Sequence, residues 1–164
     1  LMGYYNPILK MGQESFIKEC TLSDVDGIIL PDLPLEEAKE FCDMSKASKI
    51  SPILLVAPNS SKERIKKISE LAGDLIYAVS ILGITGNELS SKTKLEKYLN
   101  RVRENSQTPF VVGFGISTRE DVKWFNKHSD GAVVGSAIIE RLSTTRETKL
   151  SIKNYIKSLK GKID

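Results

Sequence analysis

The chain has 164 residues, 40% of them hydrophobic and 27% charged, and its formal net charge is +3. This length is sufficient for one domain with a buried core, and no run of about 20 apolar residues that could cross a membrane is present. Lysines and arginines mix with glutamates along helix-like stretches, which favours solvated helix faces over a nucleic-acid surface.

Apolar runs that predict strands alternate with amphipathic stretches that predict helices. The strand-like runs are 1–5, 27–31, 52–56, 75–79, 109–112 and 132–134. The helix-like stretches are 13–20, 35–45, 61–71, 92–103, 117–127 and 149–159. Pro34 suits the first turn of the second helix, and Ser117 or Thr118 caps the fifth helix ahead of an acidic first turn.

The strand-like runs are apolar on both faces, which is typical of a parallel sheet covered by helices. A complete (β/α)8 barrel needs about 250 residues, and this chain supplies about five and a half such units. A doubly wound open sheet is the alternative, but neither GxGxxG after the first strand nor a Walker A sequence occurs. We therefore predict the α/β class, with residues 1–164 forming a single partial domain of a TIM barrel. The apolar and aromatic opening indicates a fragment truncated at its N-terminus, with about strands 4–8 present.

Two glycine turns predict an anion site. Gly113-Phe114-Gly115 and Gly135-Ser136 each follow a strand-like run and precede a helix-like stretch. Glycine allows positive φ and close approach of a ligand to backbone amides, and a helix N-terminus favours negative charge. A phosphate monoester fits this arrangement. The alternative is that each glycine only makes a tight turn.

A third loop, 80–87, follows the strand-like run 75–79. Its composition predicts a lid that closes over the ligand, and its candidate residues are Gly83, Thr85 and Gly86. The two cysteines, Cys20 and Cys42, have no neighbouring histidine, so they predict free thiols in a cytoplasmic protein and no metal site.

Six stretches match one family in order and spacing, and together they cover essentially the whole chain. They are MGYYNPIL (2–9), DGIILPDLPLEEA (26–38), PILLVAPNS (52–60), YAVSILGITG (77–86), FVVGFGIST (110–118) and DGAVVGSAII (130–139). With them the sequence resembles the alpha subunit of tryptophan synthase. The resemblance implies a lyase of tryptophan biosynthesis that cleaves indole-3-glycerol phosphate into indole and glyceraldehyde 3-phosphate. It also implies no cofactor in this subunit and a pyridoxal-phosphate-dependent beta subunit as partner in an α2β2 heterotetramer.

The resemblance assigns residues to each part of the site. The phosphate site would be Gly86, Gly113, Phe114, Gly115, Gly135 and Ser136. The indole pocket would be Met2, Tyr4, Leu55, Tyr77, Phe114 and Val133. The lid would be Gly83, Thr85 and Gly86, and the partner interface Asn6, Asp32 and Pro34. For Tyr4, Tyr77 and Phe114 the alternative is plain filling of the core.

The cleavage needs a base for the glycerol hydroxyl and an acid for the indole carbon. In the family these groups are a glutamate and an aspartate on the second and third strands, upstream of the matched region. No catalytic residue is therefore predicted in this chain, and we expect it to be inactive alone. Glu36 and Glu37 lie in a helical first turn, where the helix dipole explains them. His128, the only histidine, precedes a strand and is expected in a surface loop.

Two other functions remain open from the residues. Another phosphate-binding TIM-barrel isomerase or synthase could use the same glycine turns, and a non-catalytic subunit could serve only to dock on a partner. The tyrosine–proline opening, the loop LPDLP (30–34) and the lid sequence GITGN (83–87) favour the first interpretation.

Overall fold

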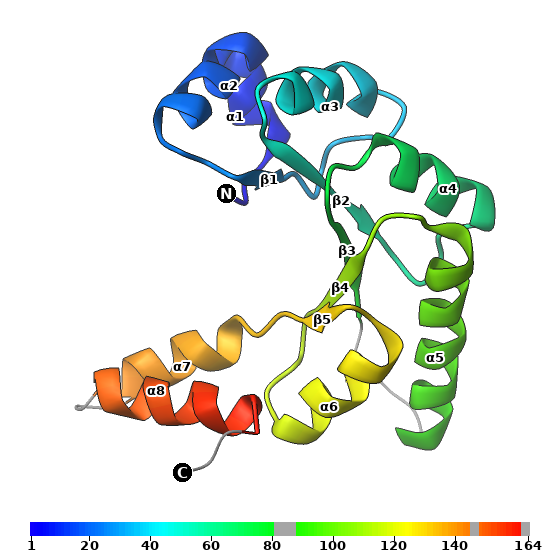
Figure 1. Ribbon diagram of the computed structural model, residues 1–164, viewed down its shortest axis with the longest axis vertical. Helices are drawn as coiled ribbons and strands as arrows, with labels where there is room; N and C mark the ends of the chain where they lie inside the picture. Colours follow the sequence, from blue (N-terminus) through cyan, green and yellow to red (C-terminus); the bar gives the residue numbers. More distant parts are fainter. Residues whose placement is uncertain (81–87, 145–147, 162–164) are drawn as a thin grey trace.

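Five parallel strands in sequential order form one curved sheet (Figure 1). The structure, a computed structural model, describes residues 1–80, 88–144 and 148–161. The strands are β1 (Gly27–Ile29), β2 (Ser51–Val56), β3 (Ile76–Val79), β4 (Phe110–Gly113) and β5 (Gly131–Ala132). The described helices are α1 (Tyr5–Met11), α2 (Gln13–Leu22), α3 (Ala38–Ala47), α4 (Lys62–Leu71), α5 (Glu88–Asn105), α6 (Arg119–His128), α7 (Ser136–Thr144) and α8 (Thr148–Leu159).

Local capping explains why two helices begin where the sequence predicts. The hydroxyl of Ser61 accepts a hydrogen bond from the N–H of Arg64 at 3.2 Å and caps α4. At α6, Thr118 accepts from the N–H of Asp121 at 3.1 Å, and the Asp121 carboxylate accepts from the N–H of Thr118 at 2.9 Å. This reciprocal capping box satisfies N–H groups that have no partner inside the helix.

The beginning of the chain differs from the prediction of a strand over 1–5. Residues 1–3 do pair with β1 in parallel: Met2 bridges Ile29, the Ile29 N–H donates to the carbonyl of Leu1 at 2.9 Å, and the Gly3 N–H donates to the carbonyl of Ile29 at 3.2 Å. The pairing ends before residue 5, because α1 begins at Tyr5. The carboxylate of Asp32 accepts from the N–H of Tyr5 at 2.8 and 3.1 Å, which stabilises the helix N-terminus. The predicted helix 35–45 likewise begins later, at Ala38.

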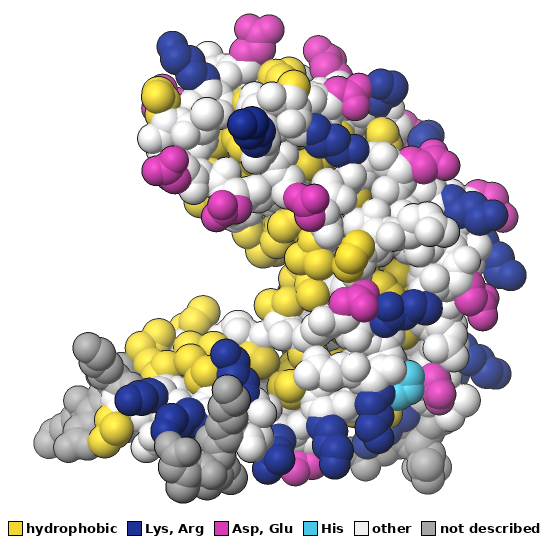
Figure 2. Space-filling view, viewed as in Figure 1, with side chains coloured by type: hydrophobic (Ala, Val, Ile, Leu, Met, Phe, Trp, Pro, Cys, Tyr) yellow, Lys and Arg dark blue, Asp and Glu magenta, His cyan; other side chains and the backbone are white. Residues whose placement is uncertain are grey.

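The two faces of the sheet have different environments. Along β2, Leu54 and Val56 are buried, whereas Ile53 and Leu55 are half-buried. Helices α3 to α6 lie on the convex side, and the other face borders the hollow of a C-shaped molecule (Figure 1). Figure 2 shows apolar side chains lining this hollow. Among the described residues, helices therefore cover the convex face of the sheet, as the prediction of a sheet covered by helices requires for that face.

The core lies between the convex face of the sheet and its helices. Its main cluster joins β2, β3 and β4 to α4, α5 and α6, with Val56, Ile65, Leu99, Val112 and Phe125 fully buried or nearly so. A second cluster joins α1, α2, β1 and α3 through residues that include Tyr5, Ile17, Ile28 and Phe41. Burial of these side chains stabilises the sheet by about 1.5–3 kcal/mol each.

The fold also bears on the cysteines, on membrane crossing and on metal binding. Cys20 and Cys42 are free thiols, as predicted, and the structure shows that both are buried. Among the described helices, none combines the length and the apolar character that a membrane crossing requires. The described residues also contain no cluster of histidine, cysteine, aspartate or glutamate that could hold a metal ion.

Candidate functional site

The two predicted glycine turns lie at the same edge of the sheet. Because β4 and β5 are parallel neighbours, the turns that follow them begin side by side at the carboxyl ends of the strands. The first turn leads from Gly113 toward α6, and the second passes Gly135 into α7, which begins at Ser136. The predicted lid residues Gly83, Thr85 and Gly86 lie outside the described residues.

The backbone of the first turn is unusual. Phe114 has a φ of 78° and Gly115 a φ of 76°. A non-glycine residue in this left-handed region is strained by about 1–2 kcal/mol, and such strain recurs at ligand sites. Among the described residues, the N–H groups of Phe114 and Gly115 have no hydrogen-bond acceptor.

Ser80, directly after β3, holds the opposite side of this turn. Its N–H donates to the carbonyl of Gly113 at 3.0 Å, and its hydroxyl lies 2.8 Å from the carbonyl oxygens of Gly113 and Phe114. In a trans peptide, each carbonyl is antiparallel to the N–H that follows it. The N–H groups of Phe114 and Gly115 therefore point away from Ser80 and β3.

The N–H groups of the first turn point toward the second turn. The strand order β3-β4-β5 means that a group on β4 pointing away from β3 points toward β5. There α7 begins at Ser136. Among the described residues, the N–H groups of Ser136 and Ala137 have no backbone acceptor, whereas the N–H of Ile138 donates to the carbonyl of Gly135 at 2.9 Å. Two successive outward N–H groups beside a helix N-terminus are an arrangement that can bind an anion.

Gly113 and Gly135 differ in what a side chain at each position would contact. A Cβ at Gly113 would overlap the hydroxyl oxygen and Cζ of Tyr77, so this glycine makes room for the phenol ring. A Cβ at Gly135 would meet nothing within 4 Å, and its φ is outside the left-handed region. Neither packing nor a tight turn therefore requires glycine at position 135, whereas close approach of a ligand would.

Three of the predicted indole-pocket residues meet at the hollow. Leu55 and Tyr77 are register partners on β2 and β3. The rings of Tyr77 and Phe114 are in edge-to-face contact, with centroids 5.8 Å apart. Burial raises the pKa of the Tyr77 hydroxyl.

The other three predicted pocket residues lie farther apart. Met2 is beside β1 through its bridge to Ile29, and Val133 directly follows β5, so both lie at the margins of the same face. Tyr4 precedes α1 and is 70% exposed. Among the described residues, core filling therefore does not account for Tyr4, nor for Phe114, which is 50% exposed.

The strand residues that border the hollow carry no carboxylate. By the alternation of side chains, the described ones are Gly27, Ile29, Ser51, Ile53, Leu55, Tyr77, Val79, Val111, Gly113 and Gly131. Tyr77 is the one ionisable side chain in this set, so these strand residues offer mainly apolar contact.

His128 is accounted for by local contacts at the other end of the sheet, in the last turn of α6 rather than in a loop. Its ring stacks on Trp124 with centroids 4.1 Å apart, and its Nδ1 lies 2.8 Å from the carbonyl oxygen of Trp124. Its Nε2 lies 3.7 Å from the carboxylate of Glu96.

The predicted partner residues lie together near the end of β1. Asn6, Asp32 and Pro34 are exposed, and Asp32 is the carboxylate that accepts from the N–H of Tyr5. Asp32 thus has a structural role that the sequence did not indicate.

Sequence reasoning missed two residues that shape the first turn. Ser80 could have been noticed because it directly follows a strand-like run, but no motif identified its contacts. Tyr155 on α8 donates its hydroxyl to the carbonyl of Ser117 at 2.6 Å. Because 38 residues separate the two, no local pattern could have predicted this contact.

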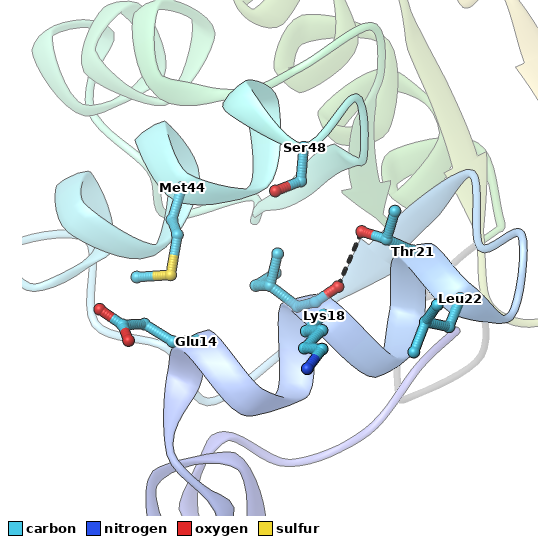
Figure 3. Close-up of a pocket in the computed structure, with 7 residues that line it drawn as sticks. Glu14, Lys18, Thr21, Leu22, Met44 and Ser48 are labelled. Carbon is cyan, nitrogen blue, oxygen red and sulfur yellow. Dashed lines mark hydrogen bonds between the residues drawn. The ribbon is translucent and has the colours of Figure 1, made fainter.

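Cavities elsewhere contain none of the predicted site residues. One of about 400 Å³ lies between α2 and α3, with Glu14, Lys18 and Met44 around it (Figure 3). The Thr21 hydroxyl at its edge donates to the carbonyl of Ile17 at 2.9 Å, a bond internal to α2. This cavity is a groove between two helices of the outer layer, remote from the glycine turns.

Comparisons with known proteins agree with this geometry. The family model for the tryptophan synthase alpha chain matches residues 1–163. A tryptophan synthase alpha chain from Petrotoga mobilis is 42% identical over an alignment of 164 residues, which covers 98% of this chain and 64% of the relative. One from Methanocaldococcus jannaschii is 45% identical over 139 residues, covering 85% of this chain and 50% of the relative.

Solved structures from Pyrococcus furiosus give the same result. A mutant tryptophan synthase alpha-subunit has a TM-score of 0.85 at 35% identity and covers 98% of this chain and 65% of that chain. A tryptophan synthase complex has a TM-score of 0.85 at 33% identity with the same coverage. This chain thus matches between 50% and 65% of the length of these relatives. It belongs to the tryptophan synthase alpha chain family.

Proposed function

We propose that this chain binds indole-3-glycerol phosphate, the substrate of a lyase step in tryptophan biosynthesis, by its phosphate and indole ends. The observation that carries the proposal is the orientation of the Phe114 and Gly115 N–H groups toward the N-terminal side of α7. The phosphate would lie against residues 113–115 and 135–136. The indole would lie against Leu55, Tyr77 and Phe114, where the hollow is apolar.

The fold proposed for the complete site is a (β/α)8 barrel, of which this chain supplies the later strands. The parallel order of β1 to β5 and the uncovered concave face support it, since a barrel interior is packed by the inward side chains of all its strands. Met2, beside β1, and Val133, after β5, would then approach one another across the closed barrel. This proposal favours the lyase over other phosphate-binding barrels, because the family match includes the whole of this region.

A second subunit is proposed as partner. A structural relative is part of a tryptophan synthase complex, and Asn6, Asp32 and Pro34 form an exposed surface at one rim. We expect this surface to bind a beta subunit, which would carry the pyridoxal phosphate, in an α2β2 assembly in the cytoplasm. If the chain served only to dock on a partner, its glycine turns would have no affinity for phosphate.

The chain alone is expected to bind without catalysing cleavage. No carboxylate borders the hollow among the described strand residues, and loss of an acid or base commonly lowers the rate about 10²–10⁴-fold. Incubation with indole-3-glycerol phosphate should release no measurable indole, with or without a beta subunit. Turnover near a typical value of about 10 per second would contradict this expectation.

Phosphate binding can be tested with glycerol 3-phosphate as the probe. In a titration followed by ¹⁵N NMR, the amides of Phe114, Gly115 and Ser136 should shift, whereas glycerol should have no effect. Gly135→Asp places a carboxylate in open space beside the site, so like charges should weaken binding about tenfold. Gly3→Asp is the matched control, because Gly3 is also open to solvent but lies beside β1. Shifts confined to other residues, or equal effects of the two variants, would refute the proposal.

A further inference from the structure

Ser80 is a buried polar side chain that contacts the backbone of the first glycine turn. It is 2% exposed, and its hydroxyl oxygen lies 2.8 Å from the carbonyl oxygens of both Gly113 and Phe114. A hydroxyl has one proton, so the two carbonyls share it in a three-centre bond. Its own N–H also donates to Gly113 at 3.0 Å, which continues the pairing of β3 with β4 beyond the last strand residue.

This contact has a consequence for the opposite side of the turn. Rotation of the peptide between Phe114 and Gly115 would move its carbonyl away from Ser80 and its N–H away from β5 at the same time. Phe114 has a positive φ, which is unfavourable for a residue with a Cβ. The turn therefore needs a restraint, and among the described residues the Ser80 hydroxyl is the donor to the Phe114 carbonyl.

Other contacts restrain the far end of the same turn. The Tyr155 hydroxyl donates to the carbonyl of Ser117 at 2.6 Å, and the Asp121 carboxylate accepts from the N–H of Ser117 at 3.2 Å. These contacts leave the 114–115 peptide itself unrestrained. Its orientation thus depends on the near end, where Ser80 lies.

We propose that Ser80 is a positioning residue of the anion site, which acts by holding the Gly113 and Phe114 carbonyls so that the next two N–H groups face the bound phosphate. The inference rests on the proposed function, since it concerns the same site. Ser80 itself lies on the side of the turn away from the anion and makes no contact with it.

Replacement of the hydroxyl tests this role. In Ser80→Ala the dissociation constant for glycerol 3-phosphate should rise about five- to tenfold, the equivalent of one lost hydrogen bond passed on to the ligand. The NMR shifts of the Phe114 and Gly115 amides should also change in the absence of ligand. Ser80→Cys, with a weaker donor of similar size, should give an intermediate loss and serves if the alanine variant does not fold.

A matched control separates positioning from general stability. Ser45 is 0% exposed and donates its hydroxyl to the carbonyl of Phe41 at 2.7 Å within α3, so Ser45→Ala loses the same kind of bond away from the turns. The Ser45→Ala variant should lose a similar amount of its free energy of unfolding as Ser80→Ala. It should nevertheless bind glycerol 3-phosphate as the unsubstituted chain does. Unchanged affinity in Ser80→Ala, or an equal loss in Ser45→Ala, overturns the inference. Absence of binding by the unsubstituted chain instead overturns the proposed function, and the inference with it.

Discussion

Addition of one methyl group at Gly113 should destabilise the chain through a specific clash with Tyr77. A Cβ there would lie 2.9 Å from Cε1 and would overlap the hydroxyl oxygen and Cζ. The backbone of Gly113 is not left-handed, so alanine carries no conformational penalty. The ring must therefore move and lose its edge contact with Phe114, which is worth about 0.5–1.5 kcal/mol. With overpacking included, we expect Gly113→Ala to lower the free energy of unfolding by about 2 kcal/mol.

The assay is urea unfolding, followed by tryptophan fluorescence and by circular dichroism. A loss of about 2 kcal/mol corresponds to a fall in Tm of about 4–8 °C for a chain of this size. In a Tyr77→Leu background the same substitution should cost less than about 0.5 kcal/mol, because the overlapping atoms are gone. If Gly113→Ala costs the same in both backgrounds, the clash with Tyr77 is not the cause and the account of this glycine is wrong.

Three further predictions concern other parts of the structure. Asp32→Asn should destabilise the chain by about 1 kcal/mol in urea unfolding, since the N–H of Tyr5 loses a charged cap at the start of α1; an unchanged midpoint would contradict this role. Desolvation raises the pKa of Asp121 and of Asp130, but hydrogen bonds outweigh it and lower both values below 3.8. Their contribution to stability is therefore fully present above about pH 4 and is lost as the pH falls through the folded-state values; an acid titration of the unfolding free energy should be flatter in the two asparagine variants. The Cys42 thiol is 0% exposed and burial raises its pKa to about 11, so a thiol reagent should label it only in urea; rapid labelling in native buffer would refute this burial.

Local signals were sufficient to predict much of the secondary structure. The strand-like runs 52–56 and 109–112 correspond to β2 and β4, and the capping hydroxyls at Ser61 and Thr118 mark the starts of α4 and α6. These signals depend on residues within four positions of one another, so the sequence alone contains them. The family resemblance was also visible in the sequence alone, because it depends on short stretches that occur in the family's order and spacing.

Other features depended on contacts between distant parts of the chain. The first five residues resemble a strand, yet Asp32 stabilises a helix from Tyr5 onward. The apolar runs do not distinguish the convex face, which helices cover among the described residues, from the face at the hollow, because both faces of each strand have similar composition.

The proposed anion site was predicted by position but not by mechanism. Glycine at 113 and 135 indicated where backbone could approach a ligand, and the tertiary structure assigned a packing reason to Gly113 and none to Gly135. The direction of the N–H groups follows from carbonyls held by Ser80, 33 and 34 residues away. The orientation of a peptide group is set by its hydrogen-bond partners, and here those partners come from the end of a neighbouring strand. The sequence by itself therefore determined where the turn lies. Only the assembled sheet determined the direction in which the N–H groups of the turn point.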